Sequence, residues 1–293
     1  MNIAIIGLGL IGGSIALALR AAKPDTNIIA FDRDEMQLDL GLRAGAIDAA
    51  TADFAAIASV DVIFICVPVA QASAVFAALK PHLHDTSVIT DAGSTKQSAI
   101  AAARAQLGSE ISHFVPGHPI AGREHSGFAA AASELFEGKN VVLTPLAENS
   151  PDTVEIVRSV WRACGARVIE MPAKTHDEIF AAVSHLPHLL AFTLVDEFAS
   201  RPNAKELFSF AASGFRDFTR IASSSPEMWC DIALDNCDAL LGEIDRHMLH
   251  MGRLREALAA RDGHAIEALM TRARDARERW LAGEFDSLRD ESA

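Results

Sequence analysis

The segment from Pro116 to Gly127, PGHPIAGREHSG, holds a histidine in a setting that could do acid–base chemistry. A neutral imidazole accepts a proton near pH 7, so His118 could act as a general base. Segments rich in Gly and Pro are also typical of surface loops. The rest of the sequence has to decide whether His118 belongs to a loop or to a reaction.

Two further segments place polar side chains where chemistry is plausible. The first, DAGSTK at residues 91–96, follows a predicted strand and opens a helix, so Ser94 could cap that helix or face a ligand at the edge of the sheet. The second, SHLPH, contains His185 and His188. Pro187 disturbs the helical geometry that two metal ligands would need, and no third ligand has a fitting spacing. We expect no metal here, but either structural histidines or contacts to a substrate.

Arginines in GFRDFTRI, at residues 214–221, are suited to an acidic substrate. The guanidinium groups of Arg216 and Arg220 are natural carboxylate binders, although they could also form a solvated helix face. The net charge of −13 argues against nucleic-acid or membrane-surface binding, which needs basic patches. We therefore expect a small-molecule substrate, with no nucleic-acid or membrane partner.

The four cysteines are Cys66, Cys164, Cys230 and Cys237. They form no CxxC pair, and their spacing fits neither a zinc site nor a dense disulfide framework. Reduced thiols are expected, which indicates a cytoplasmic protein.

The elements that must position these residues follow an alternating pattern in the first half of the chain. Strand–helix alternation with nearly continuous apolar strands predicts an α/β fold with a doubly wound parallel sheet. The predicted strands cover residues 2–6, 28–31, 62–67, 87–91, 113–116, 140–144 and 167–171. Helices are predicted over residues 14–22, 36–44, 70–79 and 96–107. The uncharged stretch 3–19 is interrupted by glycines and is short for a membrane span, so we assign it to a strand and a helix.

After Pro172 the periodicity becomes helical and no strand pattern follows. We predict two domains, 1–171 and 172–293. A heptad-like stripe predicts a long helix packed on another helix: Leu234, Cys237, Leu241, Ile244, Met248 and Met251. The other helix could belong to the same chain or to a second copy, and the sequence leaves both open.

The glycine-rich motif GLGLIG, from Gly7 to Gly12, lies between the first predicted strand and the first helix. In this context it predicts a Rossmann-type dinucleotide site, because its glycines permit a tight turn and a close approach to a pyrophosphate. The predicted cofactor-binding residues are Gly7, Gly9, Leu10, Ile11, Gly12, Asp32, Arg33 and Val67. Asp32 would accept the ribose hydroxyls and repel a 2′-phosphate, which favours NAD over NADP. Arg33 could partly accommodate a phosphate or lie in solvent near the adenine.

Five motifs in order along nearly the whole chain resemble the prephenate/arogenate dehydrogenases of tyrosine biosynthesis: GLGLIGGS, DAGSTK, GHPIAGRE, SHLPH and GFRDFTRIA. The resemblance implies a Rossmann domain joined to a helical domain that forms a homodimer. It also implies oxidative decarboxylation of prephenate to 4-hydroxyphenylpyruvate, or of arogenate to tyrosine, with hydride transfer to NAD(P).

The same resemblance implies roles for individual residues. His118 is similar to the catalytic histidine that bonds the ring 4-hydroxyl, and Ser94 to its partner. Arg220 is similar to the arginine that binds the ring carboxylate, and His188 to a histidine near the substrate side chain. Supporting roles, including an aromatic that reaches a pocket across the dimer, fall on Asp177, His185, Asp217, Glu124 and Trp229.

Arg123 departs from the family pattern, which often has a small hydroxyl residue there. A cation facing the substrate side chain would favour prephenate over arogenate, whose side chain bears an ammonium. An Arg123 that points to solvent or pairs with Glu124 would have no such effect. The sequence shows no appended regulatory or chorismate mutase segment, so we expect any tyrosine inhibition to act at the active site.

Two other classes of protein share parts of this pattern. A β-hydroxyacid or 6-phosphogluconate-type dehydrogenase would need a catalytic lysine in the helical half, where only Lys174 and Lys205 occur, in other contexts. A dinucleotide-sensing protein without catalysis would have no use for Ser94, His118, His188 and Arg220 together.

Overall fold

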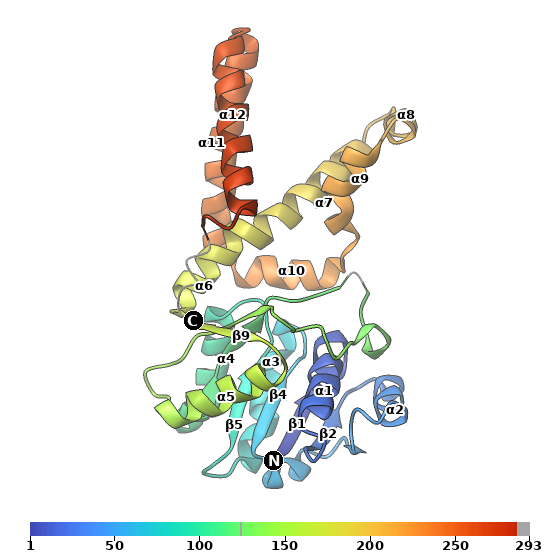
Figure 1. The fold of residues 1–293 in the computed structure, drawn as a ribbon, viewed down its shortest axis with the longest axis vertical. Coiled ribbons are helices and arrows are strands. Elements are labelled where there is room, and N and C mark those ends of the chain that lie inside the picture. Colours follow the sequence, from blue (N-terminus) through green and yellow to red (C-terminus); the bar gives the residue numbers. More distant parts are fainter. Residues whose placement is uncertain (124, 286–293) are drawn as a thin grey trace. The chain divides into compact units, whose positions relative to one another are not determined.

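The computed structural model describes residues 1–123 and 125–285 and contains a six-stranded parallel sheet with the order β3-β2-β1-β4-β5-β6 (Figure 1). This is the strand order of a dinucleotide-binding doubly wound sheet, in which the order reverses between β1 and β4. The strands are β1 Asn2–Ile6, β2 Asn27–Phe31, β3 Ala49–Ala50, β4 Val62–Ile65, β5 Val88–Asp91 and β6 Phe114–Val115.

Helices cover both faces of this sheet, which explains why its strands are apolar throughout. One core gathers side chains from α1 and α5 around Phe64, Phe136 and the fully buried Trp161. The opposite core gathers those of α3 and α4 around Phe76 and Phe114. The helices of this part are α1 Leu10–Ala22, α2 Glu35–Arg43, α3 Ala72–Leu79, α4 Gln97–Leu107 and α5 Pro151–Ala163.

A second, three-stranded sheet was not expected from the sequence. It consists of β7 Gly117–Pro119, β8 Asn140–Leu143 and β9 Arg167–Glu170, with β7 antiparallel and β9 parallel to β8. The predicted strands at 140–144 and 167–171 therefore exist but lie outside the large sheet. His118 lies on β7, opposite Val142, and not in an irregular loop.

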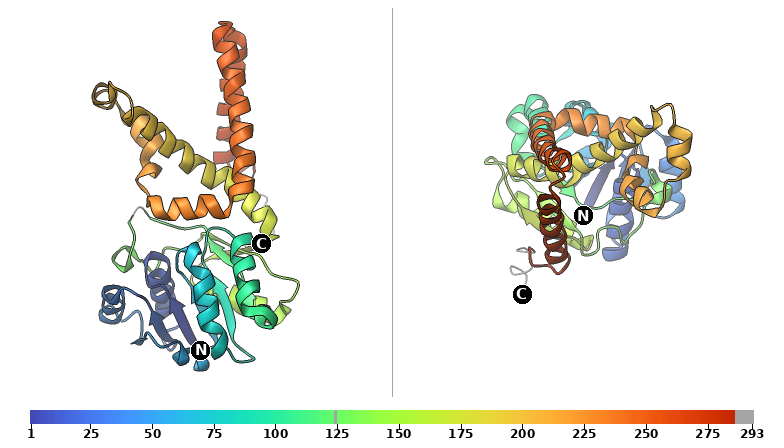
Figure 2. Two further views of the ribbon diagram at one scale, coloured as in Figure 1. Left: turned by 180° about the vertical axis from the view of Figure 1, so that it is seen from behind. Right: turned by 90° about the horizontal axis from the view of Figure 1, so that it is seen from above.

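The chain from Ala173 to Asp235 is helical, and among the described residues no strand follows Glu170. A π-helical turn, Ala181–His185, joins α6 Ala173–Phe180 to α7 Leu186–Ala199. Then follow α8 Ala204–Ser209, α9 Ser213–Thr219, a 3₁₀ turn at Arg220–Ser223 and α10 Pro226–Asp235. Figures 1 and 2 show α10 lying across the carboxyl ends of the sheet strands, where it contacts the turn Val69–Gln71 after β4.

Two compact units divide the chain, Met1–Leu240 and Leu241–Ala293. The second unit contains most of α11 Cys237–Ala259 and all of α12 Gly263–Leu281. The predicted long helix does not run through Leu234, because α10 ends at Asp235 and α11 begins at Cys237. The predicted domain boundary at residue 171 coincides with the end of the last strand, and not with the boundary between the two compact units. It stays a prediction.

One continuous helical stretch of the described residues, Ala173–Ala199, is long and apolar enough to cross a membrane by length and composition. Only 22 % of its most apolar window is buried within the chain. Its exposed apolar surface therefore needs a partner or a function. The earlier apolar stretch Leu10–Ala22 forms α1, whose inner face is buried against the sheet.

Candidate active site

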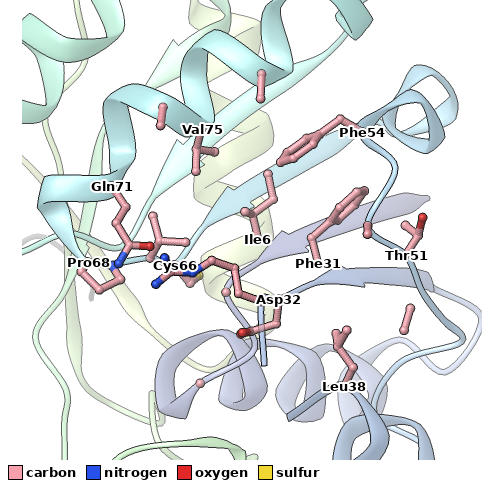
Figure 3. A pocket seen from close by; sticks show the side chains of 18 of the residues that line it. Ile6, Phe31, Asp32, Leu38, Thr51, Phe54, Cys66, Pro68, Gln71 and Val75 are labelled. Carbon is pink, nitrogen blue, oxygen red and sulfur yellow. The ribbon is translucent and has the colours of Figure 1, made fainter. Parts of the chain in front are cut away.

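A cavity of about 1010 Å³ opens at the switch point of the large sheet, between the carboxyl ends of β1 and β4 (Figure 3). The rings of Phe31 and Phe54 stack at 5.1 Å along one side of it. Five of the predicted cofactor residues line it, namely Gly7, Gly9, Asp32, Arg33 and Val67. Its size and mixed apolar and acidic lining suit a dinucleotide.

Each glycine of the motif GLGLIG meets a different steric requirement of the turn. Gly7 has φ +95°, and a Cβ added there would lie 2.5 Å from the carbonyl oxygen of Cys66. A Cβ on Gly12 would lie 2.0 Å from the oxygen of Gly7, so Gly12 permits α1 to pack against the strand. A Cβ on Gly9 would meet nothing within 4 Å, so its backbone faces open space where a phosphate can approach.

Leu10, Ile11 and Gly12 do not line the cavity with side chains but form the first turn of α1. The first backbone bond of the helix is donated by the nitrogen of Gly13 to the oxygen of Gly9. The N–H groups of Leu10, Ile11 and Gly12 come before this first bond, and they are suited to binding an anion at the helix N-terminus.

Asp32 is held rigidly at the end of β2. Its Oδ2 accepts from the nitrogen of Leu8 at 2.7 Å and its Oδ1 from the nitrogen of Asp34 at 2.9 Å. These bonds fix a carboxylate in the cavity where a ribose would lie, as the sequence predicts. The residues present therefore fit a dinucleotide.

A smaller cavity of about 570 Å³ lies beside the helical half, and it is cationic. Its lining includes four predicted substrate residues, namely Arg123, His188, Arg220 and Trp229. The Trp229 ring stacks on His188 of the same chain at 3.6 Å and 20°. Trp229 therefore lines a pocket of its own chain, and its reach toward a pocket across the dimer stays a prediction.

The charges of this pocket are not all free to bind a substrate. Arg123 Nη2 donates to Glu134 Oε1 at 3.0 Å, so its partner is Glu134. Burial lowers the pKa of His188, and the charge of Arg220 lowers it further, against a hydrogen bond to the oxygen of Ser184. His188 is therefore neutral at pH 7 and can accept or donate a hydrogen bond.

His118 is half-buried and its backbone is clamped by a buried ion pair. Lys96 Nζ, fully buried, donates to Asp91 Oδ2 and to the oxygen of Gly117, each at 2.5 Å. Asp91 Oδ1 accepts from the nitrogen of Gly117 at 3.0 Å. Burial lowers the pKa of the His118 imidazole well below 6.5, and the charge of Lys96 acts in the same direction, so the imidazole is neutral at pH 7.

Of the remaining predicted residues that the structure describes, Ser94, His185 and Asp217 are not among the lining residues of either cavity. Ser94 lies between β5 and α4, and within the described part of the chain no hydrogen bond joins it to His118. It does not cap α4 either, because Asp177 accepts from the nitrogens of Lys96 and Gln97 at that helix start.

His185, Asp217 and Glu124 differ in their positions. His185 is buried and bonded to Asn236 at 3.1 Å, and burial lowers its pKa to about 4. Asp217 is exposed on α9 and does not line the pocket. Glu124 lies outside the described residues. The roles assigned to all predicted site residues remain predictions.

Sequence reasoning missed the residues directly behind His118. His176 bonds to His118 at 2.8 Å, and Phe180 packs against both rings at 4.8 and 4.5 Å. The contacts of His118 with His176 and Phe180 join residues 58 and 62 positions apart. The only local signal is the pair His176–Asp177, eight residues before His185 and on the same apolar stretch.

Across residues 1–123 and 125–285, no three His, Cys, Asp or Glu side chains are grouped so as to hold a metal ion. The four cysteines are free thiols, and Cys164 is buried in the core. The thiol of Cys66 has a raised pKa, because it is buried and lies near the charge of Asp91.

The fold and the two cavities define a class of protein. A doubly wound sheet, a dinucleotide cavity at its switch point, and a cationic pocket and a neutral histidine in the same compact unit are the features of a nicotinamide-dependent dehydrogenase.

Comparison with known proteins makes the assignment specific. Residues 15–170 match the family model for the prephenate dehydrogenase nucleotide-binding domain, and residues 172–272 match that for the prephenate dehydrogenase dimerization domain. The chain belongs to the prephenate dehydrogenase family, which confirms the fold class and the family expected from the sequence. NAD is the cofactor of this class of dehydrogenase.

Relatives cover most of the chain. It is 37 % identical to the cyclohexadienyl dehydrogenase of Zymomonas mobilis over 89 % of this chain and 90 % of that protein. The prephenate dehydrogenase of Bacillus subtilis is 37 % identical over 94 % of this chain and 75 % of that protein. The solved prephenate dehydrogenase of A. aeolicus, in complex with hydroxyphenyl propionate and NAD+, has a TM-score of 0.89 at 33 % identity, with 95 % and 98 % of the two chains covered.

Proposed function

We propose that the protein converts prephenate to 4-hydroxyphenylpyruvate by oxidative decarboxylation, with hydride transfer to NAD+. The observation that carries this proposal is a rigid dinucleotide cavity in the same unit as a cationic pocket and a neutral His118. The related A. aeolicus enzyme, which was solved with NAD+ and hydroxyphenyl propionate, supports it.

In this reaction His118 and Ser94 have separate roles. His118 accepts the proton of the ring hydroxyl as a hydride leaves the carbon that bears this hydroxyl. Ser94 helps to orient the hydroxyl. When bound, NAD+ would accept the hydride, and loss of the ring carboxylate as carbon dioxide would make the ring aromatic. The ring oxygen then takes back the proton held by His118, which gives 4-hydroxyphenylpyruvate. General-base help of this kind is typically worth about 10²–10⁴-fold.

Substrate binding falls to the cationic pocket. Arg220 binds the ring carboxylate through its planar guanidinium, and His188, stacked on Trp229, lies near the side chain of the substrate. His185, Asp217 and Glu124 support the pocket. Gly7, Gly9, Leu10, Ile11 and Gly12 hold the pyrophosphate, while Asp32, Arg33 and Val67 contact the rest of the cofactor.

Steady-state kinetics test this function directly. NADH absorbance should appear with prephenate and not with simple hydroxyacids, and NAD should have a lower KM than NADP. A high rate with arogenate would make the protein an arogenate-preferring or dual cyclohexadienyl dehydrogenase, as the name of the Zymomonas relative suggests. A lack of turnover with both cyclohexadienes would refute the proposal.

Replacing the proposed base is the sharpest single change. We expect His118→Asn to lower kcat by about 10²–10⁴-fold, because no neutral imidazole remains to take the hydroxyl proton. NAD binding, followed by protein fluorescence, should match the wild type. Near-normal turnover would remove His118 from the mechanism.

Arg123 is the residue to test for substrate preference. If it favours the keto acid, Arg123→Thr should shift the ratio of kcat/KM for prephenate and arogenate by about tenfold towards arogenate, the equivalent of ~1.4 kcal/mol. Arg104→Thr, which breaks an exposed pair with Glu148, is the matched control and should leave the ratio unchanged. An unchanged ratio in Arg123→Thr as well would assign Arg123 to its pair with Glu134 alone.

The assembly and location belong to the same proposal. A homodimer formed through residues 172–293, beyond a nucleotide-binding domain at 1–171, would give the exposed apolar helix Ala173–Ala199 a partner. A cytoplasmic location suits the four free thiols of the chain.

A further inference from the structure

Three side chains form a continuous line of hydrogen bonds from the protein interior to the proposed base. Asp177 Oδ1 lies 2.8 Å from His176 Nδ1, and His176 Nε2 lies 2.8 Å from His118 Nδ1. Asp177 and His176 are 1 % and 0 % exposed, whereas His118 is half-buried and reaches the line from β7. Phe180 packs against both imidazole rings and restricts their rotation.

The ionisation state of Asp177, at the buried end of this line, determines which atom donates in each of its hydrogen bonds. Asp177 also accepts from the backbone nitrogens of Lys96 at 2.8 Å and Gln97 at 2.9 Å. Burial alone would raise the pKa of Asp177, but hydrogen bonds from His176 and these two nitrogens bring it below its usual value. Asp177 is therefore an ionised carboxylate, which can only accept hydrogen bonds.

It follows that His176 Nδ1 is the donor to Asp177. Burial lowers the pKa of His176, so its ring is neutral and carries a single N–H proton. With that proton on Nδ1, Nε2 of His176 has only a lone pair and must accept from its neighbour. The hydrogen bond between the two histidines is then donated by His118 Nδ1.

We propose that Asp177 and His176 act as positioning residues that hold His118 in its Nδ1–H tautomer, so that Nε2 is the atom that accepts the substrate proton. The inference rests on the proposed function for its catalytic consequence. As the hydroxyl O–H bond breaks, an N–H bond forms at His118 Nε2. The Nδ1–H bond to His176 then stabilises the resulting imidazolium, and Asp177 offsets its charge through His176.

Without this line the imidazole could take the other neutral tautomer, whose Nε2 carries a proton and cannot act as a base. An analogous change of tautomer in serine proteases lowers turnover about 10⁴-fold. A purely structural cluster would require the two rings to pack but would not require any particular proton position.

Nitrogen NMR of the histidine rings tests the tautomer without turnover. The whole protein, labelled with ¹⁵N-histidine and free of substrate, should show His118 protonated at Nδ1 and unprotonated at Nε2. Signals are assigned by their loss in His118→Asn and His176→Gln. A proton on His118 Nε2 would overturn the proposal, and this outcome does not depend on whether prephenate is the substrate.

Substitutions at His176 separate positioning from packing. In His176→Gln the amide oxygen lies near the place of Nε2 and can still accept from His118, so kcat should stay within about tenfold of the wild type. His176→Phe keeps the ring but removes the acceptor, and His176→Asn keeps a polar atom only near Asp177. Both should lose about 10²–10⁴-fold in kcat.

The KM for NAD and the midpoint of thermal unfolding identify variants that are merely unfolded. Wild-type turnover in a folded His176→Phe protein would refute the positioning role, as would equal losses in folded Gln and Phe variants. If Phe and Asn variants do not fold, the tautomer of the wild-type protein decides alone. Absence of activity with either cyclohexadiene would instead refute the proposed function.

Discussion

At the residue scale, the surroundings of His118 keep its imidazole neutral. Burial disfavours the imidazolium most strongly, and the charge of Lys96 acts in the same direction. Lys96 is itself fully buried and paired with Asp91, and both hold the backbone of Gly117 next to the histidine. A general base has to be unprotonated to work, so this environment extends the active pH range downwards.

The dependence of kcat/KM on pH should report this shift. Because the pKa of His118 lies well below 6.5, the base stays neutral as the pH falls through 6.5. We expect kcat/KM for prephenate to be nearly constant from about pH 8 to 6.5 and to fall only below that, where the imidazole is protonated. The measurement is a rate profile at constant ionic strength, and an acid limb centred at or above pH 6.5 would contradict it.

At the element scale, Asn236 explains why the helical stripe is broken. It lies between α10 and α11 with φ −111° and ψ 30°, outside helical geometry. Its Nδ2 donates to the oxygen of Asp177 at 2.8 Å and to His185 Nδ1 at 3.1 Å. The heptad-like spacing could not reveal this break, because its cause is a contact with residues 51 and 59 positions earlier.

Removing this amide should destabilise the junction. Asn236→Ala leaves a buried carbonyl and a buried ring nitrogen without a donor, which costs on the order of 1–3 kcal/mol. We expect the midpoint of thermal unfolding to fall by several degrees, measured by calorimetry. Asn203→Ala is a suitable control, since Asn203 is exposed and its side chain does not cap α8. Equal midpoints for both variants would mean that the Asn236 bonds contribute nothing.

At the scale of the whole molecule, the stripe on α11 remains exposed in the chain. Leu241, Met248 and Met251 all lie in the unit Leu241–Ala293 and are 53 %, 65 % and 51 % exposed. The match to a dimerization domain over residues 172–272 contains all three. In the homodimer that we propose, a second copy of the chain would cover them.

A charge on this stripe should disrupt the assembly. We expect Met248→Glu to shift the molar mass, measured by light scattering, from dimer to monomer, because burying an unpaired carboxylate is costly. Met36→Glu, on α2 and equally exposed at 64 %, should remain dimeric. A dimeric Met248→Glu protein would exclude Met248 from the interface.

The order and type of most elements and the position of the dinucleotide cavity could be predicted from the sequence. Those features depend on local patterns: apolar strands, the glycines from Gly7 to Gly12, and an acid at the end of the second strand. Strands and helices follow from periodicity among neighbouring residues, and the cavity follows from the spacing of the glycines and Asp32 within one strand–helix–strand unit.

The surroundings of His118 become visible only in the folded chain. The second sheet, the clamp of Lys96 and Asp91 on Gly117, and the pairing of Arg123 with Glu134 had no signal in the sequence read residue by residue. The sequence singles out Asp177 but does not predict its line of hydrogen bonds through His176 to His118. Apart from the Arg123 pair, these contacts join segments that are distant in the chain. They follow from the way the helices dock on the sheet, where burial selects neighbours that local propensity does not specify.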